Sequence, residues 1–523
     1  MGKRRFFNTT GPCNPEDHYM LPPEERLVGA QLHRYIKDKL YWVLHAPRQT
    51  GKTTFLQSWA REINADSEAV ACYVSVERCQ GVAEPERAMP DICNAIREYS
   101  GWAGLAVPET TTTEPNSMLS NLLANWSVLV APKPLIVLFD EVDVLVDDTL
   151  ISFLRQLRGG FADRGTGKFP VSVALVGMRD LKDYIIKAKD GKAVNPGSPF
   201  NIKEDSSVLG NFTKKDVIKL FAQRTEETGQ QITREALDYV YEQSKGQPWI
   251  VNSLFKRATL RILDNESNET VTLEHVMLAR QQMIEARETH LDALGVRLRD
   301  PGVKKVIQTI ITGSTDPLGR TDSNVELTLD LGLISWDKEN GFMIANPVYE
   351  EILTRYLNSP YHDSIPSPSS WKWQKDNGEL DMDRLLHEFL KFWRRHSEIW
   401  EEKADYTEAF PHLLLTAFLQ RVTNGGGHIE REYAAGRGRM DIAVEYAGKC
   451  YIIEVKVVYY YDTPATVKEE GLEQIRAYRD RTDASAPAYL VIFDRRPEAK
   501  KLSWDEKISW TMDETGLVNV LTC

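Results

Sequence analysis

Near-continuous apolar runs, separated by stretches with helical periodicity, constrain the fold of this chain more than any other feature. The runs are YWVLHA (41–46), AVACYVSVE (69–77), PLIVLFDE (134–141) and FPVSVALVG (169–177). Strands that are buried on both faces have this pattern, which is typical of a parallel sheet covered by helices. The sequence therefore predicts an α/β fold for its first part.

The loop after the first apolar run has the parts of a phosphate-binding loop. APRQTGKTT joins the expected strand to a helical stretch. Gly51 would let the backbone wrap an anion, Lys52 would reach the β- and γ-phosphates of a nucleotide, and the Thr53 hydroxyl would bind Mg²⁺. Ala46 stands where the usual pattern has its first glycine. The residues that we assign to ATP binding in this loop are Ala46, Gln49, Thr50, Gly51, Lys52, Thr53 and Thr54.

Two carboxylates at the end of the third apolar run strengthen this prediction. The run ends in Asp140 and Glu141. In nucleotide hydrolysis, the first would hold the metal ion through water and the second would polarise the attacking water. The alternative for Glu141 is a structural pairing with a basic side chain.

The order of motifs further along resembles the STAND branch of AAA-related ATPases. SKGQPWIVNSLF places a Gly-x-Pro element in a helical region, and residues 301–358 have the pattern of a winged helix, with LISWD and FMIAN as the wing. The stretches NTTGPCNPEDHYMLPPEER, HAPRQTGKTT, GMRD, SPFNIK and GQPWIVN are similar to a bacterial group of AAA-like ATP-binding proteins. The resemblance spans essentially the whole chain.

This resemblance implies further nucleotide contacts. Pro248 would pack near the base, and His18 and Tyr19 would lie close to it. The candidates for an arginine that neutralises charge on the transferring phosphate are Arg158, Arg164 and Arg179, of which we assign Arg179. By analogy, the winged helix would close on the ATPase rather than read DNA, and the protein would assemble into a homo-oligomer on activation.

A second set of charged residues lies near the other end of the chain. In the apolar strand YIIEVK, Glu454 and Lys456 share one face. The strand IAVEY precedes it, and an antiparallel hairpin can bring Asp441 beside Glu454. Metal-assisted phosphodiester cleavage needs two carboxylates to bind Mg²⁺ or Mn²⁺ and a lysine to position the nucleophile. An isolated E-x-K is more often an ion pair on a solvated face.

The D-x(n)-E-x-K arrangement resembles the PD-(D/E)XK nucleases, with Met440 in place of the usual proline. In the helical stretch GLEQIRAY, Gln474 and Tyr478 share one face and resemble the Q-x-x-x-Y element of the RecB-like branch. Glu408, at the start of an amphipathic helix, matches a glutamate that adds a metal contact in this superfamily. The resemblance implies an α-β-β-β-α-β core.

Basic and aromatic side chains near this motif leave alternatives open. Arg431, Arg437 and Arg439 could clamp phosphates or form a solvated basic turn. Trp393 shares a helical stripe with Phe389, which favours a core position over a base-stacking role.

Composition limits the possible partners and compartment. The net charge is -12, so any contact with nucleic acid needs a local basic groove. The six cysteines are scattered without a C-x-x-C pair, which favours a reducing compartment over a zinc ribbon or disulfide framework. The N-terminus lacks the apolar core of a signal peptide, and no apolar run has the length of a membrane span. We expect a cytoplasmic protein.

These observations lead to one leading hypothesis, an ATP-regulated, Mg²⁺- or Mn²⁺-dependent nuclease that cuts DNA rather than RNA, in genome defence or mobile-element control. The alternatives are a signalling ATPase whose nuclease-like domain only binds nucleic acid or a partner protein, and an ATP-driven motor on DNA. The predicted segments are an ATPase domain (1–208), a helical lid (209–292), a winged helix (293–358), a linker (359–371) and a nuclease domain (372–523).

Overall fold

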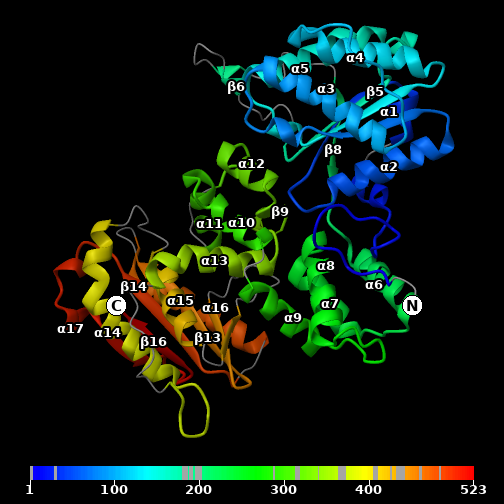
Figure 1. Ribbon diagram of the computed structural model, residues 1–523. Helices are drawn as coiled ribbons and strands as arrows, with labels where there is room; N and C mark the ends of the chain where they lie inside the picture. The colour runs from blue at the N-terminus through cyan, green and yellow to red at the C-terminus, as the bar shows by residue number, and fades with distance from the viewer. Residues whose placement is uncertain are drawn as a thin grey trace. The chain divides into compact units, whose positions relative to one another are not determined.

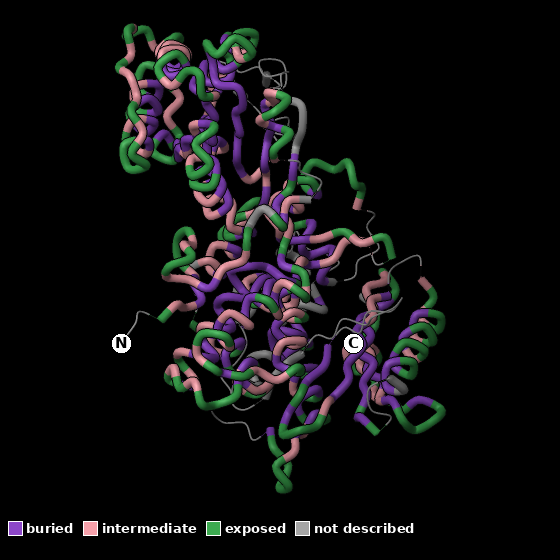
Figure 2. The backbone as a smooth tube through the Cα atoms, turned by 90° about the vertical axis from the view of Figure 1, so that its right-hand side faces the viewer, coloured by how far each residue is buried: buried purple, intermediate pink, exposed green. Residues whose placement is uncertain are grey.

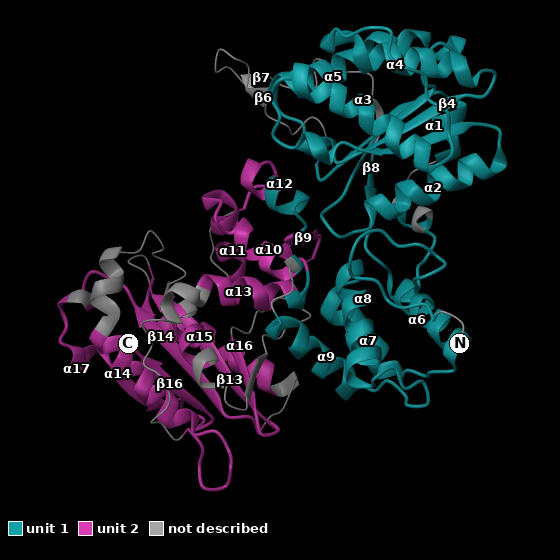
Figure 3. Ribbon diagram, viewed as in Figure 1, with its two compact units in different colours: residues 1–290, 327–332, 346–348 teal, residues 291–326, 333–345, 349–523 magenta. Residues whose placement is uncertain are grey.

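The computed structural model forms two compact units (Figure 3). Unit 1 contains Met1–His290, Leu327–Gly332 and Asn346–Val348, and unit 2 contains the rest of the chain. The residues that the structure describes are 4–28, 32–179, 186–187, 193–194, 203–286, 289–312, 318–339, 341–362, 373–403, 410–423, 427–430, 442–458, 462–481 and 485–523. The five segments predicted from the sequence stay a prediction.

Unit 1 is built on a six-stranded sheet with the order β1-β8-β2-β5-β4-β3. Five neighbouring strands run parallel, and β1 pairs antiparallel with β8 at one edge. The strands are β1 (Leu27–Val28), β2 (Tyr41–His45), β3 (Val70–Ser75), β4 (Leu135–Asp140), β5 (Ser172–Gly177) and β8 (Lys203–Leu209), with β6 (Ile186–Lys187) and β7 (Ala193–Val194) as a separate pair. The four apolar runs form β2 to β5, which confirms the predicted parallel α/β sheet.

Helices cover both faces of this sheet (Figure 1). Along β2, Tyr41 and Val43 point into one apolar core, whereas Trp42 and Leu44 point into the other. The first core is closed by α3 (Pro85–Trp102), α4 (Pro115–Val130) and α5 (Asp147–Gly160), and the second by α1 (Leu32–Lys37) and α2 (Lys52–Asp66). Every residue of β4 is buried; Figure 2 draws the backbone with buried residues in purple. This double burial explains why the strands lack polar alternation.

A bundle of helices follows the sheet within unit 1. Its elements are α6 (Lys214–Thr228), α7 (Arg234–Ser244), α8 (Pro248–Lys256), the π-helical segment η6 (Arg257–Ile262) and α9 (Leu273–Glu285). Thr213 opens α6 with a capping box that it forms with Asp216. Gly246 joins α7 to α8 with φ of +75°, and its carbonyl accepts a hydrogen bond of 2.8 Å from the Phe212 amide. The Gly-x-Pro element is therefore a turn that contacts the segment between β8 and α6.

Replacing Gly246 with alanine should destabilise unit 1 by about 2 kcal/mol or more, because the left-handed backbone is unfavourable for alanine and the new methyl group meets backbone atoms. A Cβ atom at this position would lie 1.8 Å from the Phe212 carbonyl oxygen. Gly229 is a matched control, since its φ is +78° and a Cβ there meets nothing within 4 Å. Denaturant unfolding should show a larger loss for Gly246→Ala than for Gly229→Ala; equal losses would contradict the clash.

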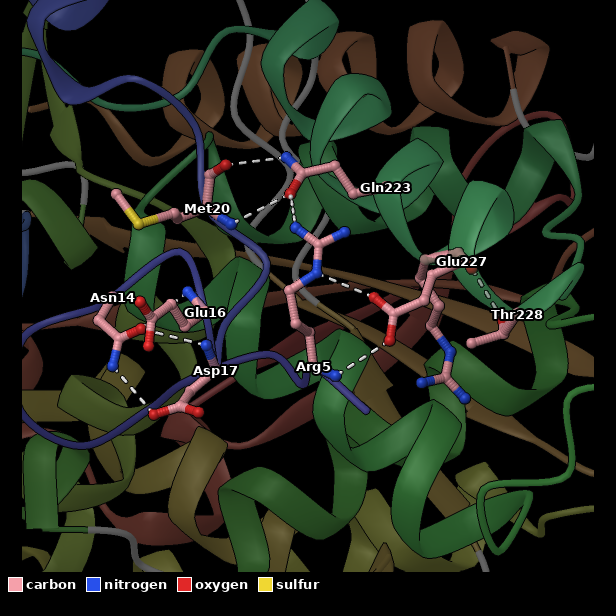
Figure 4. Close-up of polar contacts among 9 residues, drawn as sticks. Arg5, Asn14, Glu16, Asp17, Met20, Gln223, Glu227 and Thr228 are labelled. Atoms are coloured by element: carbon pink, nitrogen blue, oxygen red, sulfur yellow. Dashed lines mark hydrogen bonds and ion pairs between the residues drawn. The ribbon is translucent and has the colours of Figure 1, made fainter. Parts of the chain in front are cut away.

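The N-terminal residues pack on this bundle as an extended strap, defined as residues 4–20. Phe7 is fully buried, with its ring 5.0 Å from that of Phe255 and 4.8 Å from that of Tyr19. The polar side of the strap is drawn in Figure 4, where Arg5 forms an ion pair of 2.9 Å with Glu227 of α6. Tyr19, expected near a nucleotide base, thus lies in an aromatic cluster.

A partly buried histidine at the end of unit 1 is expected to make the stability of this unit depend on pH. The His290 ring lies 4.7 Å from that of Trp249, and burial lowers the pKa of His290 from 6.5 to about 4. Below pH 6.5 the unfolded chain binds a proton that the folded unit excludes, so the free energy of unfolding should fall by about 1.4 kcal/mol per pH unit, to a total of about 3 kcal/mol near pH 4. Calorimetry of wild type and His290→Phe between pH 7 and 4.5 tests this.

The His290→Phe variant should lose this part of the acid sensitivity. The exposed His33 provides a control, because His33→Phe should leave the wild-type pH dependence in place. Identical pH dependence in wild type and His290→Phe would show that His290 does not contribute.

The segment between the bundle and the second sheet contributes to both units. Its elements are α10 (Thr289–Arg297), α11 (Pro301–Thr312), α12 (Ser323–Asp330), β9 (Ile334–Asp337), β10 (Gly341–Ile344) and α13 (Pro347–His362). β9 and β10 form an antiparallel hairpin at the position where the sequence predicts a wing. Its identity as a winged helix remains a prediction.

Unit 2 contains a mixed six-stranded sheet with the order β11-β12-β13-β14-β16-β15. Its elements are α14 (Met382–Lys403), α15 (Phe410–Thr423), β11 (Gly427–Glu430), β12 (Ile442–Tyr446), β13 (Lys449–Val458), α16 (Pro464–Arg481), β14 (Ala488–Asp494), α17 (Trp504–Lys507), β15 (Ser509–Met512) and β16 (Val518–Thr522). From α15 to β14 the order is α-β-β-β-α-β, as expected; β15 and β16 extend the sheet. Trp393 is buried and packs on Phe493, which confirms its predicted core position.

Among the described residues, none of the helices combines the length and the apolar character needed to cross a bilayer.

Candidate functional site

The loop between β2 and α2 has the conformation of a phosphate-binding turn. Gly51 has φ of +92°, a value that favours glycine, and immediately precedes α2. The Lys52 ammonium donates hydrogen bonds of 2.7 and 2.9 Å to the carbonyl oxygens of Ala46 and Pro47. Burial lowers the pKa of Lys52, an effect that the nearby Asp140 opposes. A cation held in such a turn, at the N-terminus of a helix, suits an anionic ligand.

A buried arginine forms a hydrogen bond with the backbone of this loop. Arg26 donates a hydrogen bond of 2.6 Å to the Thr50 carbonyl and another of 2.6 Å to the Gly210 carbonyl. Burial lowers the pKa of Arg26 to about 10, which leaves it protonated at neutral pH. The arginine therefore ties the loop to the chain segment that leads into the helical bundle.

The aspartate at the end of β4 contacts the first turn of α2. The Thr53 hydroxyl donates a hydrogen bond of 2.6 Å to Oδ2 of Asp140. The Tyr73 hydroxyl, on β3, donates another of 3.3 Å to the same oxygen. Burial raises the pKa of Asp140, whereas these donors and Lys52 lower it. Threonine and aspartate are thus brought together as a Mg²⁺ site requires, with hard oxygen ligands.

The neighbouring glutamate occupies a strained position. Glu141 has φ of +60°, which is uncommon for a residue with a side chain. Its Oε2 accepts a hydrogen bond of 3.1 Å from the Ser75 hydroxyl. Burial, followed by the charge of Asp140, raises the pKa of Glu141 to about 7. A half-buried carboxyl group with such a pKa is suited to accept a proton from water near neutral pH.

Two further segments of unit 1 reach this loop. The Gln247 side chain donates a hydrogen bond of 3.3 Å to the Gln49 carbonyl, and its Oε1 caps α8 at the Ile250 amide. A Cβ added to Gly332 would lie 2.5 Å from the ring of Pro47, so residues 327–332 approach the loop closely.

The predicted arginine has a partner in the same segment. Arg179 lies 3.9 Å from the carboxylate of Asp330. By contrast, Arg164 donates to the carbonyl oxygens of Lys39 and Phe161, which places it in a structural role. Pro248 is buried at the start of α8. The assignments of Arg179 and Pro248 to nucleotide contacts stay predictions.

In unit 2, the charged pair of β13 faces α16. Lys456 donates a hydrogen bond of 2.6 Å to the Gln474 side chain and forms an ion pair of 2.9 Å with Glu454. The Glu454 side chain is 2% exposed and that of Lys456 is 22% exposed, so the surface ion pair considered as an alternative is wrong for the glutamate. A carboxylate buried to this extent needs a cationic partner, here the ammonium group and, in a metalloenzyme, a metal ion.

Gly471 allows α16 to pack close to β13 and β14. At Gly471 of α16, a Cβ atom would lie 2.6 Å from the Leu490 side chain and 3.3 Å from Cγ of Lys456. The helix can therefore approach the sheet closely enough for Gln474 to reach the lysine. Tyr478, one turn further along, is buried in the apolar core between α16 and the sheet.

Several predicted site residues lie outside the described residues. These are Glu408, Arg431, Arg437, Arg439 and Asp441. The ladder between β12 and β13 is described as far as the pair Ile442–Ile453, which adjoins Glu454. In the described part of the chain, no group of three or more His, Cys, Asp or Glu residues could hold a metal ion. The metal-binding roles of Asp441 and Glu408 therefore stay predictions.

Sequence reasoning missed the residues that contact the predicted ones from elsewhere in the chain. They are Arg26, Tyr73, Ser75 and Gln247. At Ser75 the sequence shows only a hydroxyl side chain at the end of an apolar strand, and its place beside the end of β4 comes from the strand order. The register pairs Ser75 with Asp140.

The chain was compared with curated proteins, solved structures and protein-family models. No curated protein matches the chain. Among solved structures, a Walker-type ATPase of Pyrococcus abyssi is 14% identical with a TM-score of 0.46, covering 66% of this chain and 99% of that chain. Cdc6p from Pyrobaculum aerophilum is 12% identical with a TM-score of 0.35 (63% and 91%), and the RuvB Holliday junction branch migration motor of Thermotoga maritima is 15% identical with a TM-score of 0.31 (61% and 90%).

A family model gives the more specific result for the other end of the chain. It matches residues 406–492, the region that holds Glu454, Lys456 and Gln474. Unit 1 thus has the parallel sheet and loop of a P-loop ATPase-like fold, and the C-terminal region carries a domain of the PD-(D/E)XK nuclease superfamily.

Proposed function

We propose that this protein is an ATP-regulated, metal-dependent nuclease. The proposal rests on the ion pair of the buried Glu454 with Lys456, which also contacts Gln474, within the matched nuclease region of a chain that has a loop of the P-loop type. The first arrangement suits phosphodiester cleavage, and the second suits a nucleotide-driven conformational change.

On the ATPase side, each proposed role follows from a contact. Lys52 binds the β- and γ-phosphates, for which it exchanges its present carbonyl partners. Thr53 and Asp140, already in contact, hold Mg²⁺. Glu141 accepts the proton of the attacking water, and its raised pKa of about 7 gives it the basicity for this step. Arg179 stabilises charge on the γ-phosphate.

On the nuclease side, Glu454 and Asp441 hold Mg²⁺ or Mn²⁺, with Glu408 as a further ligand. When bound, this ion supplies Lewis acidity and a water of lowered pKa. Lys456 positions the nucleophile and stabilises negative charge on the phosphate. Gln474 accepts a hydrogen bond from Lys456 and so keeps its ammonium group beside Glu454.

The finer parts of the proposal rest on analogy with the two resembled families. DNA is the favoured substrate because it is the usual one in the nuclease superfamily. A nucleotide switch joined to a nuclease suits genome defence in the cytoplasm, with an activating partner and homo-oligomer formation as in STAND proteins.

The test is incubation of the purified chain with plasmid, linear duplex, single-stranded DNA and RNA, each with Mg²⁺ or Mn²⁺, and with no nucleotide, ATP or a non-hydrolysable analogue. Cleavage of DNA should require the metal ion, and its rate should depend on ATP. In Lys52→Ala, metal-dependent cleavage should no longer respond to ATP, because the phosphate ligand is lost.

Two outcomes would contradict separate parts of the proposal. If no polynucleotide is cut under any condition, the chain is not a nuclease. If cleavage is the same with and without ATP, and the same in Lys52→Ala, the ATPase unit does not regulate it.

A further inference from the structure

The strand next to β4 presents two hydroxyl groups to the two carboxylates of the ATP site. Tyr73 and Ser75 lie two positions apart on β3 and therefore on one face. The parallel register pairs Ser75 with Asp140, so the side chains of Tyr73 and Ser75 lie beside the C-terminal end of β4. Ser75 contacts Glu141, and Tyr73 contacts Asp140. Neither residue belongs to a nucleotide-binding motif of the sequence.

Asp140 is held by donors from three directions. Its Oδ1 accepts a hydrogen bond of 3.0 Å from the Glu141 amide, and its Oδ2 accepts those of Thr53 (2.6 Å) and Tyr73 (3.3 Å). The aspartate is 1% exposed, so protein groups rather than bulk water decide how its carboxylate plane is turned. Thr53 belongs to α2 and Glu141 directly follows Asp140, so Tyr73 is the donor that comes from a neighbouring strand.

The Tyr73 ring is itself fixed by its surroundings. It meets the Tyr99 ring edge-on at a centroid distance of 5.2 Å, and Tyr99 in turn meets Trp102 at 4.8 Å. Such edge-to-face contacts define the ring orientation. The hydroxyl is therefore aimed at Asp140 by an aromatic row of β3 and α3, independently of the phosphate-binding loop.

We infer that Tyr73 is a positioning residue for Asp140, which it holds in the orientation that the metal ion of the ATP site requires. The inference rests on the proposed ATP site and adds to it a residue that acts through Asp140 rather than on the nucleotide. Groups that orient a metal-holding carboxylate commonly change metal affinity 10–100-fold when removed. Because 3.3 Å is long for an O–H···O bond, the effect of Tyr73 should lie at the lower end of that range.

The experiment measures binding of a fluorescent, non-hydrolysable ATP analogue as a function of Mg²⁺ concentration in the purified chain. Tyr73→Phe keeps the ring and removes only the hydroxyl. It should raise the Mg²⁺ concentration for half-maximal binding about 10-fold. Binding of the analogue at saturating Mg²⁺ should stay close to that of wild type.

Tyr41→Phe is the matched control. Its hydroxyl is also buried in this sheet and donates to the Pro170 carbonyl, in a bond of 3.0 Å that does not involve Asp140. It should leave the Mg²⁺ dependence unchanged. Thermal denaturation without nucleotide compares how much each lost hydrogen bond contributes to folding alone.

The possible results distinguish the positioning role of Tyr73 from the proposed ATP site itself. A wild-type Mg²⁺ requirement in Tyr73→Phe would overturn the positioning role, as would an equal shift in Tyr41→Phe. Absence of analogue binding by the wild-type chain, with or without Mg²⁺, would instead overturn the proposed ATP site.

Discussion

Lys456→Ala is expected to lower the rate of metal-dependent cleavage at least about 100-fold, the usual effect of removing one group that stabilises charge in a transition state. The ammonium lies 2.9 Å from Glu454 and 2.6 Å from Gln474, and no shorter side chain reproduces both contacts. The measurement is the initial rate of plasmid cleavage at saturating Mg²⁺ or Mn²⁺.

The strand offers its own control for this variant. Lys449 is at the start of β13 and forms an ion pair with Glu379 at the surface. Lys449→Ala removes the same charge from the same strand and should leave the rate near that of wild type.

A loss of folding could imitate a loss of catalysis, because Lys456→Ala leaves the buried Glu454 without its cation. Glu454→Gln avoids this problem, since it removes the charge and keeps the shape. This variant should also be inactive while it unfolds at a temperature close to that of wild type. Cleavage at the wild-type rate in both variants would remove this pair from the active site.

Glu141→Gln should reduce ATP hydrolysis by about 10²–10⁴-fold while ATP still binds. The amide can accept the hydrogen bond of Ser75, but it cannot take a proton from water. The phosphate-binding contacts of Lys52 and the Thr53–Asp140 pair are unchanged. Release of inorganic phosphate and binding of a fluorescent ATP analogue measure the two properties separately.

Glu98→Gln is a suitable control, because this carboxylate is exposed and paired with Arg78 at the surface of the same unit. It should hydrolyse ATP normally. If Glu141→Gln retains normal turnover, Glu141 has a structural role only, and another group activates the water.

Local sequence patterns predict much of this molecule because they report burial. The apolar runs locate β2 to β5, since a strand covered on both sides has no polar face. The period of two residues places Glu454 and Lys456 on one face. The helical spacing places Gln474 and Tyr478 on one face of a helix, whereas the contact of Gln474 with Lys456 is known from the structure alone.

Contacts between distant segments could not be predicted in the same way. Ser75 and Tyr73 become site residues only because β3 lies beside β4, and the strand order is not written in any local pattern. Gln247 reaches Gln49 because the bundle folds back on the loop. Asp330 meets Arg179 through a segment much further along the chain. Each contact depends on tertiary packing, which a single sequence read by motifs does not contain.

The strap of residues 4–20 connects two parts of unit 1 that a nucleotide switch would have to move. Its Cys13 amide donates to the Thr54 hydroxyl of α2, and its Thr9 carbonyl accepts from Trp249 of α8, both at 3.0 Å. The segment between β8 and α6 connects the sheet to the bundle. A rotation of the bundle about this segment would therefore break one of the two hydrogen bonds of the strap. Removing the strap would therefore remove both hydrogen bonds that link the loop-bearing helix α2 and the bundle through this segment.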